Sequence, residues 1–339
     1  MPERPLSQLG ERKILKTIFR KFTKNSPGLK VGMGDDAAVV QPRQGWNLVY
    51  TTDTLVEKID FDFAYSTYED AGHKAMAANL SDIAAMGAFP KHFLLNLGIP
   101  SETSLSNLLK LFYGASRLAG EYHTSLIGGD LSEAPVLMIG ITLIGEVRPP
   151  LAVLRSTASP GDILFVTGTL GDSKAGLELL KKNGSFNPVS WKKTLVKRHL
   201  NPLPRLHEGQ FLSQKRLATA MMDISDGLYT DILNLTEASG VGADIQVDNL
   251  PVSAPLLEYG MSRGINPSLL ALSGGEDFEL LFSVSQKNLK KMIRLIQSGR
   301  ITAKLVGKVT RRKGVRYFDR EEKILKIKNK GFEHFTPHV

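Results

Sequence analysis

Short apolar runs with strand character alternate with helical segments along most of the chain. The apolar runs that suggest strands are residues 48–52, 92–99, 124–130, 136–147 and 162–168. The clearest helical stretches are the alanine-rich residues 69–88 and the segment 172–182. Residues 218–240 have the pattern of a strand followed by a helix, and residues 274–284 that of a glycine turn followed by a strand. Because strands and helices alternate in both halves, we expect an α/β architecture of mixed, partly α+β, character.

Two basic segments near the ends of the chain also have clear patterns. Residues 11–24 carry Ile14, Ile18 and Phe22 at a regular helical spacing, which predicts an amphipathic helix with a basic outer face. Residues 311–330 alternate like a charged hairpin. Both segments are therefore expected to be ordinary surface elements.

The most plausible domain boundary lies within residues 145–162, where prolines and small residues follow the long apolar strand. A length of 339 residues also favours two domains. We therefore expect an N-terminal domain at residues 1–148 and a C-terminal domain at residues 149–339.

The composition is ordinary for a globular protein, with 42% hydrophobic and 23% charged residues, but it contains no cysteine. Disulfides, thiolate metal sites and cysteine nucleophiles are therefore excluded. No apolar run approaches the ~20 residues of a membrane helix, and the N-terminus has no signal-peptide core. We expect a cytoplasmic protein with no membrane partner.

The formal net charge of +9 is compatible with nucleic-acid binding. No nucleic-acid motif accompanies this charge, however. A solvated basic surface is the favoured interpretation, and no nucleic-acid partner is expected.

The segment GMGDDA at residues 32–37 fits a variant of the dinucleotide fingerprint, and Asp53 follows about twenty positions later. Yet Asp35 and Asp36 come directly after the second glycine. Two carboxylates there would repel a pyrophosphate bound at a helix N-terminus. The segment therefore needs another explanation.

Acidic residues recur beside Gly, Ser or Thr at the expected ends of strands and helices, where α/β folds build their sites. These residues are Asp36, Asp53, Asp130, Asp223, Asp226, Glu276 and Asp277. Taken singly, Asp226 is better explained as a helix N-cap, and Asp53 as part of an Asx-turn. Asp82 lies instead inside the alanine-rich helix, so its carboxylate is expected to be at least partly buried. Taken together, these acids favour one shared site.

Converging carboxylates without basic partners repel one another, and bound cations relieve the repulsion. Oxygen ligands from Asp and Thr suit Mg²⁺ better than zinc or copper. Because Mg²⁺ often completes its shell with substrate phosphates, a polyphosphate such as ATP is expected as ligand. The chain has no P-loop and no HRD or DFG element, so an ATP site must belong to another architecture.

A collinear series of segments resembles the thiamine-monophosphate kinase family, within the ATP-binding superfamily of aminoimidazole ribonucleotide synthetase. The segments are GMGDDAAVV (32–40), TTDTLVE (51–57), NLSDIAAMGA (79–88), LIGGDLS (126–132), the motif at 154–177, MMDISDGLYTDI (221–232), LSGGEDFELLF (272–282) and KGFEHF (330–335). The resemblance implies a two-domain fold and a homodimer whose N-terminal α/β domains pair across their sheets. It also implies transfer of the γ-phosphoryl group of ATP to thiamine phosphate, giving thiamine diphosphate.

The resemblance also implies which residues bind several Mg²⁺ ions, ATP and substrate. The implied metal ligands are Asp36, Thr51, Thr52, Asp53, Asp82, Asp130, Asp223 and Asp226. The implied ATP contacts are Tyr113, Gly129, Asp130, Arg155 and Ser225. The implied contacts to the thiamine part are Asp60, Glu276 and Phe332.

Three of these assignments have specific alternatives. Asp60 stands where many relatives carry a histidine, which puts that substrate contact in question. Phe332 fits a core aromatic near the C-terminus equally well. Arg155 has the alternative of a surface arginine at the domain boundary, although its whole motif fits the family.

The chemistry of the substrate agrees with the resemblance. Its acceptor is a phosphate monoester whose second pKa is about 6, so it is mostly a dianion at neutral pH and needs no general base. The seven histidines all lie outside the first seven of these segments. We expect metal-assisted positioning and direct in-line transfer without a phospho-enzyme. A carboxylate such as Glu276 beside an aromatic such as Phe332 would suit the cationic thiazolium ring.

Two alternatives remain. The first is another ATP-dependent enzyme of the superfamily, such as aminoimidazole ribonucleotide synthetase; members that use a cysteine or selenocysteine lose their usual chemistry here. The second is a non-catalytic nucleotide-binding protein, basic enough to contact RNA. That alternative would need an eroded acidic set, whereas the set in this chain is complete.

Overall fold

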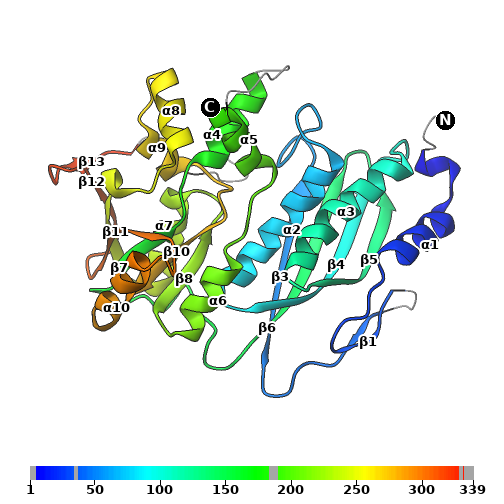
Figure 1. Ribbon diagram of the computed structural model, residues 1–339, viewed down its shortest axis with the longest axis horizontal. Helices are drawn as coiled ribbons and strands as arrows, with labels where there is room; N and C mark the ends of the chain where they lie inside the picture. Colours follow the sequence, from blue (N-terminus) through cyan, green and yellow to red (C-terminus); the bar gives the residue numbers. More distant parts are fainter. Residues whose placement is uncertain (1–4, 34–36, 183–189, 328–330, 332–339) are drawn as a thin grey trace. The chain divides into compact units, whose positions relative to one another are not determined.

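The structure is a computed structural model that describes residues 5–33, 37–182, 190–327 and 331. Contacts divide the chain into two compact units. Unit 1 contains Met1–Ile83 and Ala88–Pro150, and unit 2 contains Ala84–Gly87 and Leu151–Val339. Both units combine helices with a sheet, as expected for a mixed α/β fold (Figure 1).

Unit 1 is built on a four-stranded sheet with the strand order β3-β6-β4-β5. Its strands are β3 (Asn47–Val56), β4 (Phe89–Ile99), β5 (Ser125–Glu133) and β6 (Met138–Val147). Strands β4 and β5 are parallel and are connected through helix α3 (Leu105–Glu121), while the other pairs are antiparallel. A small antiparallel pair, β1 (Leu29–Val31) and β2 (Val39–Val40), precedes the sheet.

One face of this sheet is covered by α2 (Tyr68–Ala85) and α3 (Figure 1). Strand β6 shows the consequence, because Ile139, Ile141 and Leu143 are fully buried on the covered face. Side chains alternate along a strand, so the residues between them face the other way. On the opposite face, Tyr50 is 62% and Met138 40% exposed.

The N-terminal basic segment forms the expected amphipathic helix, α1 (Glu11–Phe22), which follows a short 3-10 turn at Leu6–Gln8. Ile14 and Ile18 are buried while the lysines and arginines of the helix remain on its outer side. The hydrophobic spacing therefore identified this element correctly.

Unit 2 is built on a seven-stranded sheet with the strand order β13-β12-β9-β11-β7-β10-β8. Its strands are β7 (Ile163–Thr167), β8 (Ala218–Ile224), β9 (Gly242–Gln246), β10 (Glu279–Val284), β11 (Ala303–Thr310), β12 (Gly314–Phe318) and β13 (Ile324–Leu325). Within this seven-stranded sheet, β12 and β9 are the only described strands that pair in parallel. The pairing of β12 with β13 confirms the hairpin expected near the C-terminus.

The remaining helices belong to unit 2. They are α4 (Asp172–Lys182), α5 (Ser190–Leu200), α6 (Leu206–Gln214), α7 (Leu228–Ser239), the 3-10 turn Val247–Asn249, α8 (Ala254–Arg263), α9 (Pro267–Ser273) and α10 (Gln286–Gln297). The main core packs apolar residues of β7, β8, β9 and β10 against α7, with Leu228, Ile232 and Leu235 fully buried. A smaller cluster joins α4, α5 and α8 around Tyr259.

Two expected strand ends are wrong. Asp53 lies inside β3 and pairs with Ile141, and Asp130 lies inside β5 and pairs with Asn96. Both strands continue past the acid because a neighbouring strand satisfies their backbone hydrogen bonds there. An acidic residue in the middle of a polar strand has no local signal that tells it apart from one at a strand end.

Candidate functional site in two separate units

The carboxylate of Asp82 meets strand β3 on the covered face of the unit 1 sheet. The hydroxyl of Thr51 donates a hydrogen bond to Asp82 Oδ2. Asp82 is half-buried within α2, as expected, between the fully buried Asn79, Leu80 and Ile83. Asp53 lies two residues beyond Thr51 and so on the same face of β3. The structure therefore brings Thr51 and Asp82 together, with Asp53 beside them.

Thr52 lies on the opposite face of the same strand. Its hydroxyl donates to the carbonyl oxygen of Ile141 at 3.0 Å and lies 3.2 Å from the hydroxyl of Thr142. The strand alternation thus separates this hydroxyl from that of Thr51. The structure does not gather these two implied metal-binding side chains on one face.

A cavity of about 970 Å³ in unit 1 brings the opening motif close to the GGD motif. Gly32, Met33 and Ala37 line it from one side, and Gly129 and Asp130 line it from the other. Gly129 has φ +154°, and a Cβ there would lie 2.0 Å from the carbonyl oxygen of Leu95. Only glycine permits this close strand contact. The cavity therefore brings together two motifs that are far apart in sequence.

Asp130 and Asp53 belong to opposite edges of the sheet. The row that starts at Asp53 ends at Gly129, three strand spacings or about 14 Å away. The carboxylate of Asp130 accepts a hydrogen bond from the Ser132 hydroxyl at 2.9 Å. Mg²⁺ binds its ligands at about 2.1 Å, so one ion cannot join both ends of this row.

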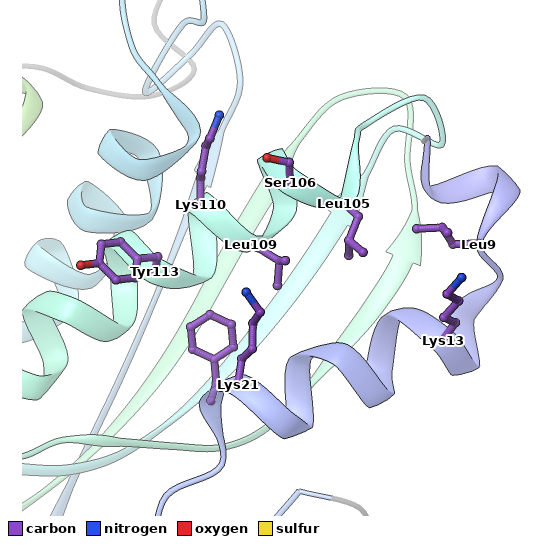
Figure 2. A pocket seen from close by; sticks show the side chains of 9 residues that line it. Leu9, Lys13, Lys21, Leu105, Ser106, Leu109, Lys110 and Tyr113 are labelled. Atoms are coloured by element: carbon purple, nitrogen blue, oxygen red, sulfur yellow. The ribbon is translucent and has the colours of Figure 1, made fainter. Parts of the chain in front are cut away.

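Tyr113 lines a different hollow of unit 1. It is 54% exposed on α3, at a groove of about 790 Å³ between α1 and α3. Figure 2 shows Lys13 and Lys21 of α1 and Lys110 of α3 around this groove. An exposed aromatic ring near ammonium groups suits a flat anionic ligand. Tyr113 is not among the residues that line the cavity at Gly129 and Asp130.

Asp60 organises a turn of unit 1. Its carboxylate accepts a hydrogen bond from the backbone N–H of Val56 at 2.7 Å. The buried Lys74 donates to its carbonyl oxygen, also at 2.7 Å. The residue that replaces the family histidine therefore stabilises the loop that follows β3.

In unit 2, Asp223 lies near the end of β8, and Ser225 and Asp226 lie in the turn between β8 and α7. Asp223 is 5% exposed, whereas Ser225 and Asp226 are half-buried. The helix N-cap is Gly227, and no side chain caps the helix through a hydrogen bond. The alternative explanation of Asp226 as an N-cap is therefore wrong.

A residue that sequence reasoning missed, Asp231, lies against this turn. It is 1% exposed, on the first turn of α7, and accepts hydrogen bonds from the backbone N–H groups of Ser225 and Asp226. Burial, followed by the charges of Asp223 and Asp226, raises its pKa well above the ordinary value. Within the described chain its Oδ2 atom has no hydrogen-bond partner. Three carboxylates thus interact here, and one carries a buried, unsatisfied oxygen.

The loop before β10 lies next to this turn. The backbone N–H of Glu276 donates to the carbonyl oxygen of Ser225 at 2.7 Å, and that of Phe278 donates to Ile224 at 3.0 Å. Glu276 and Phe278 have φ +64° and +50°, a left-handed conformation that is rare and strained for such residues. The structure therefore joins the implied ATP contact Ser225 to the implied substrate contact Glu276.

The next two acids, Asp277 in the loop and Glu279 at the start of β10, are buried and accept hydrogen bonds from several donors. Asp277 accepts the N–H groups of Gly171 at 2.5 Å and Ser173 at 3.0 Å, at the start of α4, and burial raises its pKa to about 7. Glu279 binds Arg205 through two hydrogen bonds and Arg198 through one. Burial alone would raise the pKa of Glu279, but these arginines lower it. These two acids stabilise the loop.

Arg155 lies exposed on the irregular segment that precedes β7. Its carbonyl oxygen accepts a hydrogen bond from the Ser239 hydroxyl at 2.8 Å, which attaches the segment to the end of α7. None of the ion pairs among the described residues involves its guanidinium. That group is therefore available to an anion.

Two implied site residues, Asp36 and Phe332, lie outside the described residues. Within the described ranges, no group of three or more His, Asp or Glu side chains is arranged closely enough to hold a metal ion. The full set of implied metal ligands therefore stays a prediction.

Comparison with known proteins gives the family. The AIR synthase related protein models match residues 34–147 for the N-terminal domain and 159–320 for the C-terminal domain. Thiamine-monophosphate kinase of Buchnera aphidicola subsp. Acyrthosiphon pisum is 38% identical over 326 residues, covering 96% of this chain and 98% of the relative. The Bacillus subtilis enzyme is 38% identical over 310 residues, covering 90% and 93%.

A solved structure of AaThiL complexed with AMPPCP and TMP is also similar. It superposes with a TM-score of 0.77 at 33% identity, covering 99% of this chain and 100% of that one. Sequence and structure thus agree over nearly the whole length. The chain belongs to the thiamine-monophosphate kinase family.

Proposed function

We propose that this protein transfers the γ-phosphoryl group of ATP to thiamine phosphate and so makes thiamine diphosphate. The observation that carries the proposal is the near full-length similarity to thiamine-monophosphate kinases, one of which is solved with AMPPCP and TMP. The chain also has the separate motifs that such a reaction needs, in both units. As an enzyme of cofactor biosynthesis it would act in the cytoplasm. Among the described residues, no helix is long and apolar enough to span a bilayer.

The donor atoms of the proposed set are carboxylate and hydroxyl oxygens, which are the ligand types that suit Mg²⁺. In unit 2 the unsatisfied Oδ2 atom of Asp231 lies in a group of like charges with Asp223 and Asp226, which a divalent cation would stabilise. In unit 1 the donors are the carboxylates of Asp53, Asp82 and Asp130 and the hydroxyl of Thr51. The full proposed set is Asp36, Thr51, Thr52, Asp53, Asp82, Asp130, Asp223 and Asp226. Several Mg²⁺ ions there would neutralise the phosphates of both substrates and hold them in line.

The residues of the chain itself bind and orient the nucleotide. Gly129 lines the unit 1 cavity, and its lack of a side chain permits the close contact of this strand with Leu95 of β4. The exposed guanidinium of Arg155 offers two parallel donors to phosphate oxygens. The backbone N–H of Glu276 donates to the carbonyl oxygen of Ser225, which places the proposed nucleotide contact beside the proposed acceptor contact. Tyr113 would contact the adenine ring from the groove on α3.

No residue needs to act as a general base, because the acceptor phosphate is already largely ionised at neutral pH. Catalysis is therefore assigned to positioning and charge neutralisation, with direct in-line transfer. Glu276 is assigned to the cationic thiamine part, together with Phe332 and with Asp60 at the edge of unit 1. The strained backbone of Glu276 supports this role, since such strain gathers at functional sites.

We also propose a homodimer that forms through the open face of the unit 1 sheet. Tyr50 and Met138 are exposed there, and Thr52 and Thr54 lie on the edge strand β3 between Tyr50 and Val56, the partner of Met138. A sheet with one uncovered face that carries large apolar side chains is suited to pair with a second copy.

Mass spectrometry of the products tests the reaction directly. The purified chain is incubated with ATP, Mg²⁺ and thiamine phosphate, and we expect thiamine diphosphate and ADP in equal amounts. Formation of AMP, or of ADP without thiamine diphosphate, would overturn the assignment. Light scattering across a concentration series tests the dimer, with Tyr50→Glu as the variant expected to give a monomer.

A further inference from the structure

His199 lies beside the proposed substrate carboxylate, although its sequence segment belongs to no recognised motif. Its Nδ1 atom is 3.5 Å from Glu276 Oε2 and 3.0 Å from the Ser173 hydroxyl. The side chain of His199 is 2% exposed and that of Glu276 31% exposed. One side of the Glu276 carboxylate thus faces a buried imidazole, while the residue still reaches the surface.

Helix packing places the imidazole there. A Cβ on Gly176 of α4 would lie 2.2 Å from the carbonyl oxygen of Leu195 and 3.1 Å from the Cβ of His199. Helix α5 therefore approaches α4 as closely as backbones permit. This contact fixes the last turn of α5, which carries His199, against α4.

The partners of His199 are themselves held. The N–H of Ser173 donates to the buried carboxylate of Asp277, the residue directly after Glu276. Arg198, the neighbour of His199, binds Glu279 at 2.8 Å and lies 3.8 Å from Asp172. The same turn of α5 therefore contacts the loop on both sides of the strained residue Phe278.

We propose that His199 is a positioning residue: with Ser173 it orients the Glu276 carboxylate toward the cationic ring of the acceptor substrate. This inference rests on the proposed function, in which Glu276 contacts the thiamine part. A flexible glutamate loses side-chain entropy when it binds, and a fixed neighbouring side chain that already restricts it removes part of that cost. His199 therefore acts on acceptor binding and leaves ATP binding unchanged.

Steady-state kinetics of paired variants test this role. His199→Leu removes the nitrogen, and we expect it to raise the KM for thiamine phosphate about tenfold, with little change in the KM for ATP. His199→Asn places an amide nitrogen near the position of Nδ1 and is expected to restore most of the affinity for thiamine phosphate. His199→Gln places the amide nitrogen further out and is not expected to restore that affinity. His207→Leu, at an exposed histidine of α6, is the matched control and should behave as wild type.

A double-mutant cycle identifies the route of the effect. In a Glu276→Gln background, His199→Leu should add no further increase in KM, because both changes act on one contact. If Glu276→Gln raises the KM and His199→Leu does not, the inference fails and the proposed function stands. If His199→Leu raises both KM values and lowers the melting temperature, His199 is merely structural and the inference fails. If Glu276→Gln leaves the KM unchanged while wild type makes thiamine diphosphate, the substrate role of Glu276 and this inference fail together.

Discussion

The end of β8 and the start of β10, two paired strands, are both rich in carboxylates, yet they hold them in opposite ways. Around the start of β10, Asp277 caps the beginning of α4 and Glu279 is bound by two arginines. Around the end of β8, Asp223 and Asp226 lie near Asp231, whose buried Oδ2 has no partner within the described chain. The difference separates acids that stabilise the fold from acids arranged for a ligand. Four substitutions test this comparison.

The largest effect is expected from Glu279→Gln. The change leaves the guanidinium groups of Arg198 and Arg205 beside a neutral amide in a buried site, so the free energy of unfolding should fall by about 3 kcal/mol. Urea unfolding measures it. Glu208→Gln is the matched control, because Glu208 contacts the same Arg205 at 3.7 Å from a more exposed position and should cost well under about 1 kcal/mol. Equal losses in the two variants would contradict the comparison.

Asp226→Asn should have the next largest effect, and on activity instead of stability. Removing one charge from a proposed metal ligand should lower kcat/KM by about two to three orders of magnitude, since charge neutralisation carries the catalysis. The melting temperature should not fall, because the carboxylates near Asp231 repel one another. ADP release and calorimetry measure the two quantities. Glu237→Gln, exposed on the same helix α7, is the control. If Asp226→Asn lowered the melting temperature, Asp226 would belong with the acids that stabilise the fold, and the comparison would be contradicted.

Asp277 should make stability depend on pH. Its folded-state pKa of about 7 lies above the ordinary value of 3.8, so the folded protein binds the extra proton between these limits. Its contribution is therefore present below pH 4 and is lost as the pH rises through 7. Each unit of pKa shift corresponds to about 1.4 kcal/mol in the free energy of unfolding, so unfolding at several pH values can measure this change. The wild-type slope over this range should flatten in Asp277→Asn; the same slope in both proteins would show that another group titrates.

The smallest effect is expected from Asp231→Asn, and it should be stabilising. The amide keeps an oxygen for the N–H groups of Ser225 and Asp226 and removes the cost of burying an ionisable carboxyl near two others, which favours folding by about 1 kcal/mol. Its new N–H₂ group can donate to the neighbouring carboxylates. Thermal unfolding with and without Mg²⁺ measures the change. A loss of stability in the absence of the ion would place Asp231 with the scaffold acids.

Much of the fold could be predicted from the hydrophobic pattern. The amphipathic helix at residues 11–24 and the strand-to-helix segment at 218–240 form as expected, because their apolar spacing matches what the core buries. The ends of polar strands could not be predicted. Asp53 and Asp130 lie within longer strands, since pairing with β6 and β4 depends on residues distant in sequence.

The site could be predicted only in part, for a similar reason. Motif acids such as Asp82 and Asp226 were recognisable from their neighbours. Asp231 resembles any acid in the first turn of a helix, and its role is visible only once its backbone contacts with Ser225 and Asp226 are known. His199 reaches Glu276 because Gly176 lets the backbones of α4 and α5 come into contact. In the sequence, the only sign of this contact is a single glycine.

The left-handed backbone at Glu276 has a consequence for engineering. A glycine would adopt φ +64° without strain, so Glu276→Gly is expected to relieve roughly 1 kcal/mol locally. A screen that rewards heat resistance alone would enrich this variant while discarding the carboxylate assigned to the acceptor. Thermal stability and catalytic turnover would then favour different residues at position 276. Directed evolution of this enzyme therefore needs selection for both properties.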